Sequence, residues 1–131
     1  MEYKVIIDGV AELSDEISEI EFSAKIPADS NARSSNIKAN LTIKGKISFM
    51  DGRTFMKDNM QKIADWSLVK PSLADSYKNV TLEYMHAGAP RKYELPQAFV
   101  ISYTEKFGNT DGTFELVLKQ KEDMIGEVAI S

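Results

Sequence analysis

Apolar and polar side chains alternate between residues 37 and 49, and this pattern constrains the fold more than any other feature of the chain. The apolar face comprises Ile37, Ala39, Leu41, Ile43, Ile47 and Phe49. A period of two is typical of a β-strand that buries one face. Such a strand would extend about 43 Å, well beyond the usual length, so it must bend or run past the body of its own subunit. Gly45 is the natural point for a bend or bulge.

Other segments complete a mainly β pattern with one helix. Period-two alternation recurs at residues 16–26, 80–85 and 113–119. These strands predict an antiparallel sheet. Helical spacing of apolar residues predicts one helix over about 54–66, and Pro71 blocks its continuation. The residues expected to pack this helix against the sheet are Phe55, Met56, Met60 and Ile63.

Length, charge and cysteine content limit the class of protein. The 131 residues show no repeat or linker, so we expect one domain over 1–131. The absence of cysteine excludes disulfides, thiolate metal sites and a thiol nucleophile. A net charge of −4 with interspersed signs argues against a nucleic-acid partner. The start of the chain is neither a secretory signal nor a membrane span, so we expect a cytoplasmic location and no membrane contact.

Three segments are apolar on both faces, namely 5–7, 98–101 and 116–118. An antiparallel sheet usually exposes one face to water, and one helix of about 18 Å is too short to cover all three segments. Either the sheet closes into a barrel, or neighbouring subunits cover the remainder, or both. The simpler alternative is a closed barrel with a few surplus apolar residues on its outside.

The chain offers few residues for catalysis. His86 is the only histidine and stands at the edge of a turn, where a solvated residue is the ordinary interpretation. Ser35 and Ser67 begin Ser-x-x-Lys patterns, which are frequent by chance and are not accompanied by the companion motifs of penicillin-recognising enzymes. A His pair, a zinc motif and a Gly-rich phosphate loop are all absent from the sequence. We therefore expect no enzyme, no catalytic residue and no cofactor.

Acidic residues also have simpler explanations than metal binding. Residues 109–112 with Glu115 resemble part of a calcium loop but lack its twelve-residue spacing, and a hairpin turn between strands 98–107 and 113–121 explains them better. Asp15, Glu16, Glu19 and Glu21 are expected on the solvated face of a strand. No metal site is expected. Trp66, at the end of the helix, is expected to anchor the core.

The order and spacing of elements resemble a known family. The resemblance extends from Lys44-Gly45-Lys46-Ile47-Ser48-Phe49 through the helix to Val80-Thr81-Leu82-Glu83-Tyr84, and residues 93–108 and 114–121 look like a closing hairpin. Together they resemble the tube protein of type VI secretion systems, the haemolysin-coregulated protein family, whose fold phage tail tube proteins share. The resemblance implies a six-stranded antiparallel β-barrel flanked by one α-helix. It also implies hexameric rings that stack into a tube, with sheath and baseplate proteins as further partners.

The chain is therefore interpreted as a self-assembling structural subunit of a contractile injection apparatus, phage-tail-like or type VI-like. The polar segment 29–36 is predicted to stack one ring on the next, with a simple connector as the alternative. Its polar residues are Asp29, Ser30, Asn31, Arg33, Ser34, Ser35 and Asn36. Phe99 and Ile101 are predicted to make lateral contacts. The competing interpretation is a monomeric β-barrel that binds one small hydrophobic ligand, although the large inward side chains favour a filled interior.

Overall fold

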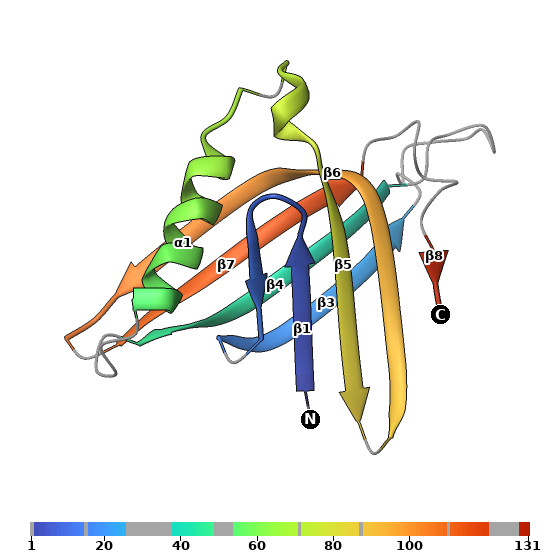
Figure 1. The fold of residues 1–131 in the computed structure, drawn as a ribbon, viewed down its shortest axis with the longest axis horizontal. Helices are drawn as coiled ribbons and strands as arrows, with labels where there is room; N and C mark the ends of the chain where they lie inside the picture. Colours follow the sequence, from blue (N-terminus) through green and yellow to red (C-terminus); the bar gives the residue numbers. More distant parts are fainter. Residues whose placement is uncertain are drawn as a thin grey trace.

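The computed structural model describes residues 2–14, 16–25, 38–48, 54–70, 72–86, 88–109, 111–120 and 129–131. The strands are β1 (Glu2–Ile7), β2 (Ala11–Leu13), β3 (Ile17–Lys25), β4 (Lys38–Ser48), β5 (Lys78–His86), β6 (Ala89–Phe107), β7 (Asp111–Gln120) and β8 (Ala129–Ile130). The helix α1 spans Thr54–Ser67, and a short 3₁₀ turn, η1, spans Ala74–Ser76. The predicted mainly β class with one principal helix is confirmed (Figure 1).

All eight strands belong to one antiparallel sheet. Its order is β2-β1-β5-β6-β7-β4-β3, and β8 pairs beside β6. The end strands β2 and β3 do not pair with each other within the described ranges, so the sheet stays open. The expectation of a closed six-stranded barrel is therefore wrong in both strand number and closure. The sheet does not close because β2, with only three residues, offers too few backbone groups to pair with β3. The strand number was underestimated because β2 and β8 are too short to show a periodic pattern in the sequence.

The nineteen-residue strand β6 folds the sheet into two layers. Its first half pairs with β5 and its second half with β7, and Ala98 pairs with both neighbours. Just before this point Gln97 has a φ of 60°, which a non-glycine residue rarely adopts. The Gln97 N–H donates to Asn79 Oδ1 at 3.1 Å, which helps to hold this conformation. In Figure 1 the strands β1 and β5 consequently run across the direction of β3, β4 and β7.

Gly45 has a different role from the predicted bend. β4 pairs with β7 without a register shift through this position, and the bulge falls on the partner strand, between Ile17 and Glu19. A Cβ at Gly45 would lie 2.0 Å from the Glu16 carbonyl oxygen and 2.5 Å from Phe114 Cε1. Only glycine fits here, because the Glu16 backbone and the Phe114 ring occupy the space that a Cβ would need. Glycines within strands often mark such a close approach.

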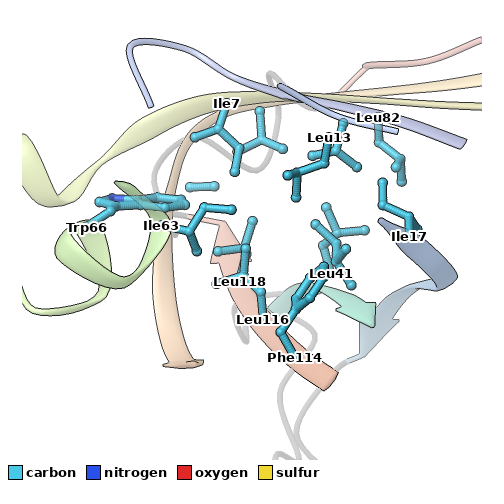
Figure 2. Packing of buried hydrophobic residues seen from close by; sticks show 14 of the residues in the cluster. Ile7, Leu13, Ile17, Leu41, Ile63, Trp66, Leu82, Phe114, Leu116 and Leu118 are labelled. Atoms are coloured by element: carbon cyan, nitrogen blue, oxygen red, sulfur yellow. The ribbon is translucent and has the colours of Figure 1, made fainter. Parts of the chain in front are cut away.

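Apolar side chains fill the space between the two layers (Figure 2). The predicted inward face of β4 is confirmed for Ala39, Leu41, Ile43 and Ile47, which are buried. Ile37 and Phe49 lie outside the described residues. The interior also includes Val5, Ile7, Leu13, Val80, Leu82, Leu95, Phe114, Leu116 and Leu118. Burial of each such side chain stabilises the fold by about 1.5–3 kcal/mol, so this interior is the main source of stability.

The helix closes one side of this interior. Met60 and Ile63 are buried as predicted, whereas the side chains of Phe55 and Met56 lie outside the described part. Trp66 is buried too, which confirms its role as a core anchor. None of the helical segments that the structure describes is long and apolar enough to span a membrane.

Candidate assembly surfaces

The second half of β6 is a free edge of the sheet. From Phe99 to Phe107 the strand pairs with β7 on one side, while β5 on the other side begins only opposite Ala98. No other described strand pairs with this edge, which extends about 30 Å at the usual rise per residue. Ile101 is 51% exposed and Phe107 is 57% exposed. An exposed apolar edge is a template for pairing with another chain.

The two residues predicted to make lateral contacts lie together on this edge. Phe99 is half-buried, and its ring meets that of Tyr77 edge to face, with 5.7 Å between the centroids. Ile101 is the extra residue of a β-bulge between Val100 and Ser102. A bulge redirects a side chain, here toward solvent. The pair thus combines a supported aromatic ring with an exposed aliphatic side chain, and its contact with another subunit stays a prediction.

The edges at the two ends of the strand order, β2 and β3, are protected. β2 is short, and β3 carries exposed Glu19 and Glu21, in agreement with the predicted solvated acids. Short length and charge both discourage edge-to-edge pairing. The prediction for Glu16 was wrong, because its side chain is only 4% exposed. The turn before β3 directs it inward, where Oε2 accepts a hydrogen bond from the Ser14 N–H at 3.3 Å. Asp15 lies outside the described residues.

The predicted stacking segment 29–36 lies outside the described residues, so its role stays a prediction. Ser35 and the side chain of His86 also lie outside the described part of the chain. Ser67 is described, and its hydroxyl donates to the Ala64 carbonyl oxygen at 2.6 Å within α1. The Ser67 hydroxyl is thus engaged in a hydrogen bond to the backbone of its own helix.

The predicted hairpin between the last two long strands is confirmed, since Phe107 pairs with Gly112 where β6 passes into β7. Across the described ranges, no group of three or more His, Cys, Asp or Glu side chains is arranged to hold a metal ion.

Tyr103 was not singled out from the sequence, yet it links α1 to β6. Its hydroxyl donates to Glu105 Oε1 at 2.5 Å and lies 3.7 Å from Met60 Sδ. Burial raises the pKa of Tyr103 well above its usual value, and the hydrogen bond to Glu105 and the charge of that carboxylate raise it further. The phenol therefore stays protonated and acts as a donor, which suits a structural link.

A groove of about 790 Å³ lies where β1 and β6 begin and β5 ends, beside the turn into β3. Tyr3, Tyr84 and Arg91 line both this groove and a smaller adjoining hollow. The Tyr3 and Tyr84 rings lie 5.3 Å apart, and the Arg91 guanidinium lies 5.8 Å from the centre of the Tyr93 ring. The lining residues are far apart in the sequence and follow no periodic pattern, so nothing in the sequence could have revealed this groove.

Solved structures with this fold include Hcp1 from Flavobacterium johnsoniae and a chain of the PVC sheath-tube complex, an extracellular contractile injection system in its extended state. Hcp1 has a TM-score of 0.59 and 12% identity, over 92% of this chain and 90% of that chain. The second has a TM-score of 0.54 and 16% identity, over 98% of this chain and 87% of that chain. No protein-family model and no curated protein matches the sequence. The fold expected from the resemblance to haemolysin-coregulated and tail tube proteins is thereby confirmed, apart from the number of strands and barrel closure.

Proposed function

From a fold shared with Hcp1 and with a component of a sheath-tube complex, we propose that this chain is a subunit of the inner tube of a contractile injection apparatus. The observation that carries the proposal is the extent of the likeness, which covers 92% and 98% of the chain in the two comparisons. The subunits form hexameric rings, and the rings stack into a tube. The role is structural and not enzymatic, and it leaves the subunit in the cytoplasm until it is assembled.

The free edge of β6 supports ring formation. It exposes two large apolar side chains, Ile101 and Phe107, each more than half exposed, whereas the β3 edge exposes Glu19 and Glu21. We assign the β6 edge to a contact with a different surface of the neighbouring subunit. Such heterologous contacts close into rings when the rotation between subunits allows it. Phe99 and Ile101 are the residues we assign to this lateral contact.

Segment 29–36 remains our sequence-based assignment for stacking between rings, and sheath and baseplate proteins are the further partners that the proposal requires. The competing function, a monomeric barrel around a small hydrophobic ligand, has less support. The space between the layers is occupied by large buried side chains such as Leu41, Leu116 and Leu118. A ligand would have to displace a packed interior.

Size-exclusion chromatography with light scattering, followed by negative-stain imaging, tests the proposal. We expect a species of about six times the monomer mass, as a hexamer requires, together with annular particles and stacks of them. A chain that stays monomeric at every concentration and shows no rings would overturn the proposal.

A further inference from the structure

The connection between α1 and β5 forms an ordered knob with an apolar tip. We use the name knob for residues 68–70 and 72–76. Leu68 is 82% exposed and Leu73 is 52% exposed. The backbone is nonetheless well hydrogen-bonded, since the Leu73 N–H donates to the Lys70 carbonyl and the Ser76 N–H to the Leu73 carbonyl, both at 3.0 Å. The two leucines are therefore presented to solvent by a defined structure.

Trp66 holds the knob to the body of the subunit. Its Nε1–H donates to the Ser76 carbonyl oxygen at 2.9 Å, and its ring is buried in the core. A protruding apolar tip on a fixed base fits an interaction surface better than a solvated turn.

The groove lies at the opposite end of the same layer. β5 starts at Lys78, two positions after the last knob residue, and reaches the groove at Glu83 and Tyr84. Tyr84 stands six positions after Lys78 along the strand, which corresponds to about 20 Å. In Figure 1 the knob projects beyond the start of β5, whereas the β5–β6 hairpin and the N-terminus mark the other end.

The two surfaces are complementary in polarity. The groove offers the rings of Tyr3 and Tyr84 to apolar side chains, and the knob offers two leucines. Three of the described residues that line the groove are cations, and two of these are already paired, Lys4 with Glu12 at 3.3 Å and Lys92 with Glu94 at 3.1 Å.

Arg91, the third cation, has no carboxylate partner among the described residues, and Asp75 on the knob has no basic partner there. Glu83 in the groove and Lys70 on the knob likewise have no oppositely charged partner among the described residues. Both signs of charge can therefore be matched across a contact. Exposed charge pairs of this kind contribute more to register than to affinity.

We propose that the knob of one copy docks into the groove of the next copy, so that Leu68 and Leu73 contact Tyr3 and Tyr84 while Asp75 pairs with Arg91. This inference rests on the proposed tube function and adds a second stacking contact. Because knob and groove lie at opposite ends of one layer, the contact repeats head to tail and propagates. The β6 edge is assigned to lateral contacts, so we assign this contact to the joining of successive rings.

Substitution of the two leucines tests the contact. The double variant Leu68→Asp with Leu73→Asp should retain rings and lose tubes in negative-stain images. The matched control Leu68→Met keeps an apolar side chain and should form tubes like the unaltered chain. Circular dichroism spectra that match the unaltered chain establish that the exposed substitutions leave the fold intact.

Charge reversal provides an independent test. Asp75→Arg alone and Arg91→Asp alone should each shorten the tubes, and the two together should restore their length. Tubes of unchanged length in the leucine double variant would overturn this inference while leaving the ring proposal intact. Loss of rings as well as tubes in that variant would overturn the assignment to stacking. An unaltered chain that forms neither would overturn the proposed function, and this stacking contact with it.

Discussion

Phe22 on β3 stacks on Tyr93 of β6, with 4.9 Å between the ring centroids and 30° between the ring planes, although the two strands are not hydrogen-bonded neighbours. The stack therefore joins β3, in one layer, to the first half of β6, in the other, by a side-chain contact without backbone pairing.

Phe22→Ala should lower the free energy of unfolding by about 2 kcal/mol, since it removes both the stacking and part of a half-buried side chain. Chemical denaturation of Phe22→Ala, Tyr93→Leu and the double variant measures the coupling between the rings. Strictly additive effects would show that the stack contributes nothing of its own.

Ile63→Asp should destabilise the fold by several kcal/mol, roughly 3–5, because it places an unpaired charge in the fully buried interface between α1 and the sheet. The control Lys62→Asp, on the exposed side of the same helix, should change stability by less than about 1 kcal/mol. Equal melting temperatures for the two variants would contradict the packing of α1.

Gly45→Ala should cost about 2–4 kcal/mol, because its Cβ would overlap the Glu16 carbonyl oxygen and the Phe114 ring. Gly9→Ala is the comparison. Gly9 has a φ of 74° but no neighbouring atom within 4 Å of an added Cβ, so only backbone strain of about 1 kcal/mol is expected. Thermal melts that rank Gly9→Ala as the more damaging change would be evidence against the close approach at Gly45.

Tyr103 should make stability fall at alkaline pH. Its pKa is raised in the folded state, so the contribution is complete below the unfolded value of about 10 and is lost as the pH rises above it. Tyr103→Phe should remove this part of the alkaline decline while losing the hydrogen bond to Glu105. Denaturation curves between pH 8 and pH 11 compare the two chains. Parallel curves for both would mean that Tyr103 titrates normally.

Ile101→Asp should abolish rings, since it places a charge on the apolar edge of β6 that we assign to lateral contact. Thr113→Asp, at an exposed position on the neighbouring strand β7, is the control and should leave rings intact. Light scattering measures the particle mass of both variants and so shows whether each forms rings. Rings that survive Ile101→Asp would remove this residue from the interface.

The period-two pattern in the sequence was enough to predict β4 and its buried face, because alternation of side chains depends only on the local backbone. Closure of the sheet was not predictable, since it depends on how many residues β2 contributes and not on any periodic signal. A bend or bulge of the long strand was assigned to Gly45, whereas the bulge lies on β3, opposite Gly45. The sheet itself bends at Gln97, a residue type that does not favour positive φ. Tertiary hydrogen bonding, here from Gln97 to Asn79, overrode local preference.

Of the candidate surfaces, the sequence predicted Phe99 and Ile101 because their segment is apolar on both faces. The groove and the knob were missed. The groove gathers Tyr3, Tyr84 and Arg91 from three strands, and each of these residues is ordinary in its own segment. The knob leucines resemble core residues in the sequence, and only their exposed fractions distinguish them.

The continuity of β6 through both layers has a mechanical consequence. A load applied to the free edge near Ile101 passes along covalent backbone through Gln97 into the half that pairs with β5. Sliding of one layer over the other would have to stretch that backbone or break several inter-strand hydrogen bonds together, in shear. Stiffness under tension in this subunit thus comes from chain connectivity, and it does not depend on the strength of side-chain packing between the layers.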